Sequence, residues 1–418
     1  MYNLHLTAEQ LEFRDTVRDF VEREIRPAAL HPDRLQPFDK PLLKELLDRA
    51  SQMGLRTLAL PEEAGGAGAD TLTTCIVLEE LAAGDVDIAM ALGQTAVLAR
   101  ELFGAAGKQP AIERLLAGFI EDDAQHLALA SVAGDAVGWS YHRPAAGDDT
   151  AALTAVEQGN EWVLNGTLPY VANAPIAKLI IVRARTGANK GGPQGMSALL
   201  VPRDATGITV HEVIRAIGGS AAGGQPGIRW HHGPGAALSF RDCKVPAGLV
   251  VARDGHGLAA GVSPARSDPA FAAINLGVGR AAYDAAVEYA RIRRQGGRNI
   301  IEHQAIGGKL AECAMKLELA RTMIWKAAWA ADHPEAVADR SLSALPLHTI
   351  ARVYTAEAMN EVALYAAECF GAMGVMRDMP LQKYVHDTMV FLHSEDTDTA
   401  SKLQIAEAVA GYRRPVAA

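Results

Sequence analysis

The chain has 418 residues, of which 49% are hydrophobic and 21% are charged. This length and composition suit a globular protein with a large buried core and two or three domains. The net charge of −9 and the pI near 5.8 provide no basic field for nucleic acid or an anionic membrane surface, so nucleic acid is not an expected partner.

Residues 1–122 are predicted to form an N-terminal helical domain, because apolar residues recur at helical spacing through most of this segment. Thr7 and Gln10 have the spacing of a capping box. A further helix is predicted to begin at Asp70-Thr71, after the glycine-rich segment 64–68. No strand is expected before that segment and no Lys-Ser/Thr follows it, so we interpret it as a turn rather than a phosphate cradle.

Residues 123–254 are predicted to form a middle β domain. Its short β-rich runs are separated by glycine and proline, and lie at 161–164, 179–184, 197–201 and 237–240. The Asn165-Gly166 pair predicts a hairpin turn. The glycine-rich stretch 218–235 is a predicted loop, either over a site or on the surface.

Residues 255–418 are predicted to form a C-terminal helical bundle, which makes the fold class α+β. Apolar residues between Ile306 and Ile324 alternate at spacings of four and three, which predicts a seam between packed helices. Asp332-His333-Pro334 and Pro346 mark expected breaks between helices.

The four cysteines stand far apart, without C-x-x-C or Cys/His spacing. They are therefore predicted to be buried free thiols, and no metal site is expected. The N-terminus lacks a basic stretch followed by an apolar run, and no apolar run approaches the roughly 20 residues that span a bilayer. We expect a cytoplasmic protein without membrane insertion.

Helices, a β domain and a helical bundle follow each other in the order of the acyl-CoA dehydrogenase family, which the sequence resembles over nearly its whole length. The resemblance is carried by segments 6–10, 20–25, 61–66, 293–304 and 370–374. It implies an FAD-dependent dehydrogenase of an acyl-CoA or another compound with an acidic C–H bond. It also implies an electron-transfer flavoprotein or oxygen as electron acceptor, and a homodimer or homotetramer.

Two of these segments resemble the parts of the family that contact the distal half of FAD. In the family, one subunit makes these contacts to the FAD of its neighbour. The first contains Arg293, Arg294, His303 and Gln304, and the second contains Glu368, Gly371 and Ala372. A guanidinium can bind a phosphate in bidentate fashion, and a turn of small residues lets backbone N–H groups approach a pyrophosphate. Without the resemblance, the two arginines would be interpreted as solvated surface charges.

The segment 165–174 resembles the strand that lies against the flavin ring. Tyr170 stands where the family has Trp, which is an acceptable stacking exchange. Ala172 replaces the hydroxyl that usually reaches flavin N5, and Asn173 matches the family. The loop 131–138 lacks the family's flavin-loop motif, so contacts there, as at Val132, are expected from the backbone. The alternative is an ordinary hairpin with an aromatic core residue.

The segment from His393 to Thr397 resembles the family's catalytic Tyr-Glu-Gly-Thr. Glu395 is then the base that removes the substrate α-proton while the β-hydrogen leaves as hydride to flavin N5. Asp396 stands where the family has Gly and is an alternative base or a substrate contact. Thr397 and Thr399 are candidate cofactor contacts. The alternative is an acidic helix start capped by one of these threonines.

Asp268 stands where the family has an arginine that contacts CoA, so its charge is expected to repel an anionic ligand. Segments 300–304 and 159–163 are also similar to the nitroalkane oxidases of the same superfamily, which use Asp where this chain has Glu395. Three functions therefore stay open: acyl-CoA dehydrogenation, a CoA-independent flavin oxidation, and a non-catalytic flavoprotein or scaffold subunit.

Overall fold

The computed structural model describes residues 5–34, 41–106, 110–131, 153–186, 195–211, 219–220, 226–227, 231–253, 268–376, 378–393 and 398–411. Its helices in the N-terminal part are α1 (Ala8–Phe20), α2 (Arg26–Ala29), α3 (Lys44–Gln52), α4 (Thr71–Gly84), α5 (Val86–Ala106) and α6 (Pro110–Glu121). The predicted capping box of Thr7 and Gln10 begins α1, and Asp70 caps α4 through the backbone N–H of Thr73. The glycine-rich turn before α4 is also confirmed, since Gly65 and Gly68 have φ angles of 85° and 64°.

The middle of the chain forms strands, and those with more than two residues all belong to one sheet. They are β1 (His126–Ser131), β2 (Leu153–Gln158), β3 (Glu161–Ala172), β4 (Ala177–Arg185), β5 (Met196–Pro202), β6 (Ile208–Val210), β9 (Gly235–Pro246) and β10 (Val250–Ala252). Their order is β10-β5-β4-β2-β3-β9-β6, with β1 parallel to β4. A separate pair joins β7 (Gly219–Ser220) to β8 (Pro226–Gly227). The four predicted β-rich runs lie in β3, β4, β5 and β9.

The predicted hairpin turn at Asn165-Gly166 is wrong. The β2–β3 hairpin turns at residues 159–160, where Gly159 has a φ of 65°. Asn165 and Gly166 lie inside β3, at an irregularity in its pairing with β9. There the side chain of Asn165 donates to Asp242 Oδ1 at 3.2 Å and accepts from the Asp242 backbone N at 2.9 Å. The pair therefore forms an irregular position within a long strand.

The C-terminal part is helical. Its helices are α8 (Pro269–Ile292), α9 (Gln304–Asp332), α10 (Glu335–Ala338), α11 (Leu347–Phe370), α12 (Leu381–His393) and α13 (Asp398–Ala410). A small hairpin of β11 (Arg294–Gln295) and β12 (Arg298–Asn299) joins α8 to α9. The apolar seam is confirmed, since Leu310, Cys313, Leu317, Ala320 and Ile324 are all buried in α9. All four cysteines are buried.

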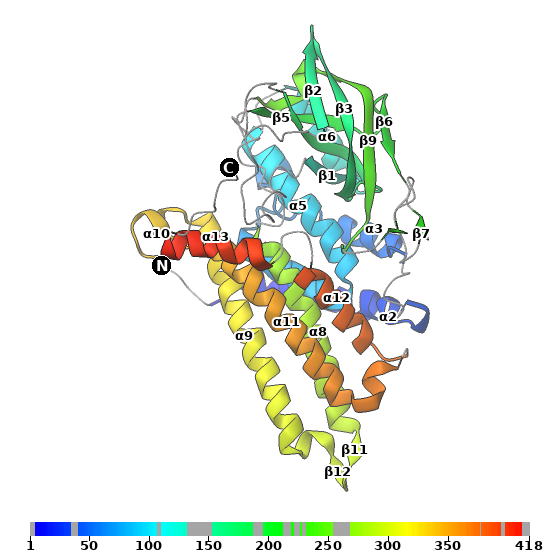
Figure 1. Cartoon of the computed structure of the whole chain (residues 1–418), viewed down its shortest axis with the longest axis vertical. Coiled ribbons are helices and arrows are strands. Elements are labelled where there is room, and N and C mark those ends of the chain that lie inside the picture. The colour runs from blue at the N-terminus through cyan, green and yellow to red at the C-terminus, as the bar shows by residue number, and fades with distance from the viewer. Residues whose placement is uncertain are drawn as a thin grey trace, which may run out of the picture.

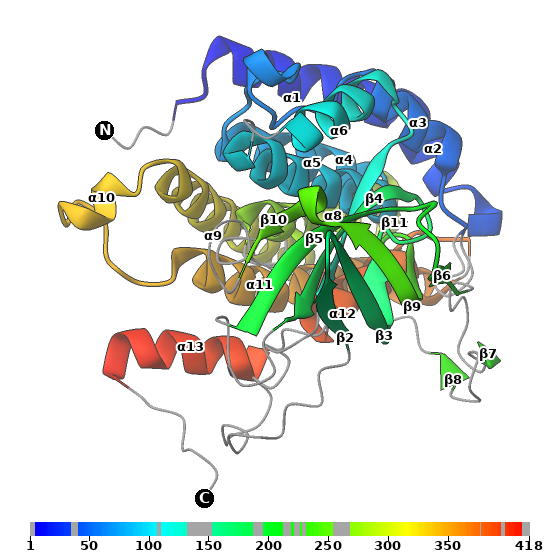
Figure 2. The same ribbon diagram turned by 90° about the horizontal axis from the view of Figure 1, so that it is seen from above.

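The helices of the two ends of the chain share one hydrophobic core, and the sheet has its own. Figure 2 shows α8 between the N-terminal helices and the pair α9 and α11. The crossing of α4 and α8 is close, because a Cβ on Gly277 would lie 2.3 Å from the carbonyl oxygen of Glu79. The N-terminal and C-terminal segments therefore form one helical body, and the middle segment forms a sheet at one end of the molecule (Figure 1).

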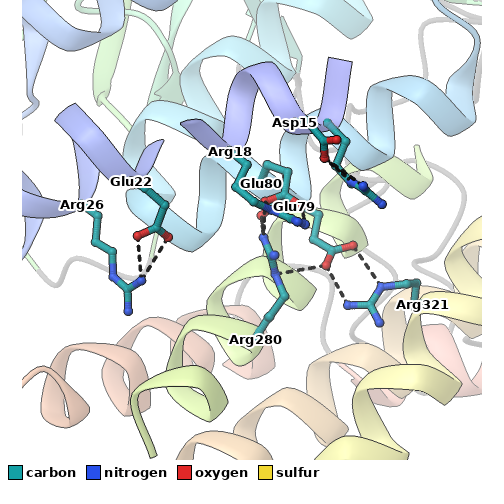
Figure 3. Close-up of polar contacts among 9 residues, drawn as sticks. Asp15, Arg18, Glu22, Arg26, Glu79, Glu80, Arg280 and Arg321 are labelled. Carbon is teal, nitrogen blue, oxygen red and sulfur yellow. Dashed lines mark hydrogen bonds and ion pairs between the residues drawn. The ribbon is translucent and has the colours of Figure 1, made fainter. Parts of the chain in front are cut away.

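A network of ion pairs reinforces this shared helical body (Figure 3). Glu79 and Glu80 of α4 are 6% and 4% exposed. Arg280 of α8 contacts both of them, at 3.2 and 2.8 Å. Arg18 of α1 contacts Glu80 at 2.6 Å, and Arg321 of α9 contacts Glu79 at 2.8 Å. Burial alone would raise the pKa of Glu80, but the arginine hydrogen bonds outweigh it and lower that pKa. Both buried carboxylates are therefore compensated.

Candidate functional site

The predicted site residues that the structure describes form two groups. The first lies where β3 and β9 meet α5 and α12, and we call it the sheet group. The second, the tip group, lies at the end of the helical bundle farthest from the sheet, where the β11–β12 hairpin projects (Figure 1). The 24 residues of α8 run towards this tip, a length of about 36 Å.

Tyr170 defines the sheet group. Its ring stacks on His231, with centroids 3.8 Å apart and planes inclined by 17°. The ring lies directly over Gly235, where a Cβ would come within 2.2 Å of it. Ala172, two residues further along β3, pairs with Gly235 across the β3–β9 ladder and is partly exposed. Glycine at 235 therefore leaves the space that the aromatic ring occupies beside β9.

Asn173 joins three elements below this ring. It is 2% exposed and has a φ of 61°. Its side-chain amide donates to the carbonyl oxygens of Ala91 and Leu127 at 2.9 and 3.2 Å, and contacts Thr95 Oγ1 at 3.3 Å. These bonds fasten the end of β3 to α5 and to β1. The amide hydrogens of Asn173 are thus engaged within the protein.

α12 packs against the same region through His232. The Nε2 atom of His232 lies 2.8 Å from the backbone oxygen of Asp387, and its ring contacts Phe391 with centroids 4.8 Å apart. α12 then ends at His393 and α13 begins at Asp398. The predicted residues between them, Glu395, Asp396 and Thr397, lie outside the described residues, as does Val132. Thr399 is the second residue of α13.

The tip group is exposed and ordered by local hydrogen bonds. Arg294 donates to the Gly297 carbonyl at 3.0 Å, and His303 Nε2 lies 3.0 Å from the Gln295 carbonyl. Arg293 is the C-cap of α8 and is exposed. Its guanidinium makes no hydrogen bond or ion pair with any residue that the structure describes.

The second tip segment lies beside the first. Phe370 stacks on Tyr289 of α8, with centroids 4.1 Å apart and planes inclined by 11°, which brings the end of α11 to the end of α8. Glu368 forms an ion pair with Lys309 near the start of α9, and this hydrogen bond raises the pKa of Lys309. Gly371 has a φ of 59° and open space where a Cβ would be. The structure thus brings Arg293, His303, Gln304, Glu368, Gly371 and Ala372 to one end of the bundle.

These features fit a dinucleotide. An uncompensated guanidinium beside a turn with open space suits a phosphate, and an aromatic strand at the sheet suits a planar ring. The sheet group lies beside the sheet and the tip group at the far end of the helical bundle, so the fold keeps the two groups apart (Figure 1).

Asp268 does not stand free at the start of α8. Its Oδ1 accepts from the Ala270 backbone N at 2.9 Å as an N-cap, and its Oδ2 lies 2.5 Å from Arg100 Nη2. Burial of the guanidinium lowers the pKa of Arg100, but the charge of Asp268 and its hydrogen bond raise it overall. The ion pair reduces the repulsion that the sequence predicts between Asp268 and an anionic ligand.

Three residues near the site were not predicted from the sequence. Arg100 and Glu101 lie in α5, and burial raises the pKa of Glu101 to about 7. His232 was missed as well, although the His231-His232 pair just before a predicted strand was a visible signal. The partners of His232 and Arg100 stand 155 and 168 residues away, so spacing could not reveal them.

A surface cavity of about 320 Å³ opens elsewhere, between α1, α4 and α8. It is lined by Arg18, Glu22, Arg26, Glu80, Arg280 and Asp284, together with three apolar residues. Three arginines face three carboxylates there, so their formal charges cancel. None of its lining residues belongs to the predicted site.

An N-terminal helical part, a sheet and a helical bundle in this order are the architecture of a class of oxidoreductases, the acyl-CoA dehydrogenases. The N-terminal, middle and C-terminal domains of acyl-CoA dehydrogenases match residues 7–123, 143–224 and 266–410. A probable acyl-CoA dehydrogenase, YngJ of Bacillus subtilis, is 31% identical over 97% of this chain and 98% of its own length. The mouse mitochondrial short-chain specific acyl-CoA dehydrogenase is 29% identical over 94% of this chain and 88% of its own.

Solved structures of acyl-CoA dehydrogenases have the same fold. Butyryl-CoA dehydrogenase from Megasphaera elsdenii superimposes with a TM-score of 0.80 at 24% identity, over 98% of this chain and all of that one. A glutaryl-CoA dehydrogenase complex gives 0.80 at 25% identity, over all of this chain and 98% of that one. The chain therefore belongs to the acyl-CoA dehydrogenase family and is an oxidoreductase of that family, which is FAD-dependent. No described helix is both long and apolar enough to cross a membrane.

Proposed function

We propose that this protein removes hydrogen from the α and β carbons of an acyl-CoA thioester, with Glu395 as the base that takes the α-proton. Bound FAD would supply the acceptor for the β-hydride. The observation that supports this best is the contact between the sheet and α12: His232 joins α12, which leads to Glu395, to the segment that stacks on Tyr170. A carboxylate base and a flavin must lie on either side of the same substrate carbons. This contact joins α12, the helix that precedes Glu395 in sequence, to the segment that stacks on the proposed flavin strand.

We further propose that FAD is held between two protomers of a homodimer or homotetramer. Tyr170 and Ala172 of one protomer would lie along the ring, with Val132, Asn173, Thr397 and Thr399 nearby. Arg293 and Arg294 of the other would hold the phosphates, with His303, Gln304, Glu368, Gly371 and Ala372 at the adenine end. An electron-transfer flavoprotein or oxygen would reoxidise the flavin.

One observation favours a second candidate, a CoA-independent oxidation such as that of a nitroalkane. The place of a CoA-contacting arginine in the family is held by Asp268, whose carboxylate is already used as an N-cap and as the partner of Arg100. Position 268 itself therefore offers no cation to a nucleotide phosphate, and the neighbouring Arg100 is already paired with Asp268. A nitroalkane needs none, and its α-carbon is acidic enough for a carboxylate base.

Anaerobic titration of the purified protein separates these functions. Bleaching of a yellow protein by butyryl-CoA or octanoyl-CoA is the expected result, and bleaching by nitroethane alone would support the second candidate. A colourless protein that takes up no FAD would refute both and support a scaffold role. Cofactor released by heat should migrate with FAD on chromatography, because the tip group would serve the distal phosphate and adenine. FMN would contradict this assignment.

A further inference from the structure

A buried histidine joins the segment before β9 to α12. His232 is 5% exposed and lies just before β9. Its Nε2 is 2.8 Å from the backbone oxygen of Asp387, and its ring packs on Phe391 one turn further along α12. A carbonyl oxygen can only accept, so Nε2 carries the hydrogen of this bond. Together these contacts fix both the position and the rotation of α12 at this point.

The residues on either side of His232 fix the same segment from two other directions. His231 stacks on Tyr170. The backbone N of Gly233 donates to Asp87 Oδ1 of α5 at 2.7 Å, and that oxygen lies 3.8 Å from Nδ1 of His232. Three consecutive residues therefore contact the proposed flavin strand, α12 and α5 in turn.

The acceptor of His232 lies on a firmly held turn of α12. Lys383 and Asp387 form an ion pair at 2.8 Å, with side chains 3% and 0% exposed. Burial lowers the pKa of Lys383, but the charges of Asp387 and of Asp85 outweigh it and raise that pKa. Breaking a buried pair of this kind by removing one partner is strongly destabilising. The turn of α12 that accepts the bond from His232 is therefore held by a buried ion pair within the helix.

We propose that His232 is a positioning residue for the reaction: its Nε2 bond to Asp387 sets the distance between the Tyr170 strand and the end of α12 that leads to Glu395. This proposal rests on the proposed function, because it gives the role of base to Glu395. Proton abstraction depends steeply on geometry, and a misplacement of about 1 Å can cost on the order of 100-fold in rate. In this proposal His232 acts through α12, by its bond to Asp387, and through its neighbour His231, which stacks on Tyr170.

Two amide substitutions test which nitrogen matters. In His232→Gln the amide nitrogen takes the place of Nε2 and can still reach the Asp387 carbonyl. In His232→Asn it takes the place of Nδ1 and falls short. Both side chains are neutral, so neither adds a charge beside Asp87. We expect His232→Asn to slow flavin reduction at saturating substrate by roughly 10- to 100-fold with little change in substrate Kd or FAD content, and His232→Gln to stay within a few-fold of wild type.

Hydrogen exchange of the cofactor-loaded protein provides a readout that needs no substrate. Peptides covering 384–393 should exchange faster in His232→Asn than in wild type and close to the wild-type rate in His232→Gln, while peptides from α9 stay unchanged as the internal control. Wild-type exchange and reduction rates in His232→Asn would overturn the proposal, and so would rescue by Asn but not by Gln. If no acyl thioester reduces the wild-type flavin, the proposed function fails, while the exchange comparison still decides whether Nε2 holds α12.

Discussion

Gly235 lies directly against the ring of Tyr170, and this contact gives a sharp test of the proposed flavin strand. A Cβ at this position would come within 2.2 Å of Cε2, 2.4 Å of Cζ and 2.5 Å of the hydroxyl oxygen of Tyr170. Carbon atoms in contact lie about 3.5–4.0 Å apart, so Gly235→Ala must move the ring by about 1 Å or more. The stack on His231 would be lost as well. The φ of Gly235 lies outside the left-handed region, so alanine strains no backbone there.

Overpacking of this kind costs about 1–3 kcal/mol, and we expect the lower end because the partly exposed Tyr170 ring can swing away. Urea unfolding should therefore show a loss of about 1 kcal/mol in Gly235→Ala, while the FAD content falls because the ring leaves its place. In a Tyr170→Ala background the same substitution should cost almost nothing, since its partner is gone. An equal cost in both backgrounds would refute the clash with Tyr170. Full FAD content in Gly235→Ala would refute the role of this ring in flavin binding.

Three further predictions concern the base, the helix crossing and a buried histidine. Glu395→Gln should slow stopped-flow flavin reduction by a factor on the order of 10²–10⁴ with FAD still bound, and Asp396→Asn should be far milder; the reverse order would move the base by one residue. Gly277→Ala should lower the free energy of unfolding by about 1–3 kcal/mol, because its Cβ meets a carbonyl oxygen of α4 at 2.3 Å. Gly104→Ala, with no atom within 4 Å of its Cβ, should not be destabilising, and equal losses in both would contradict the reasoning. Burial lowers the pKa of His126 from 6.5 to about 4, so the unfolded state binds its proton first and stability should fall as pH drops from 6.5 towards 4. His126→Gln should lose less stability than wild type between pH 7.5 and pH 5 in urea titrations, and an unchanged loss would assign the effect to other groups.

The parts of the fold that could be predicted are those that local chemistry determines. The Thr7 capping box and the Asp70 cap need only a few neighbouring residues, and the α9 seam needs only its own repeat. The Asn165-Gly166 pair shows the limit of such signals. The same two residues suit a hairpin turn and an irregular position inside a strand, and the choice was made by Asp242, which is 77 residues away and bonds to Asn165. A distant partner overrode a local preference.

For the candidate site, too, the sequence indicated single residues but not how the fold arranges them. Motif resemblance pointed to Tyr170 and Arg293, but it could not show that they lie at opposite ends of the helical bundle. Nor could it show that Arg100 neutralises Asp268. The sequence shows that residue 268 carries a charge, but only the folded structure shows which distant residue pairs with it. The sequence consequently overestimated the repulsion at Asp268.

The separation of the two groups makes the shared cofactor site testable by complementation. If Tyr170 of one protomer and Arg293 of its neighbour hold the same FAD, a dimer of a Tyr170→Ala chain with an Arg293→Ala chain contains one site with both defects and one with neither. Each variant alone should purify with little FAD. Co-expression with two different affinity tags, followed by tandem purification, isolates the mixed dimers, which should hold FAD in about half of their sites. If instead each FAD is bound within one chain, every site in the mixed dimer carries one defect and no FAD returns. Mixed dimers of Tyr170→Ala with a second Tyr170→Ala chain are the matched control, since both arrangements predict no recovery for them.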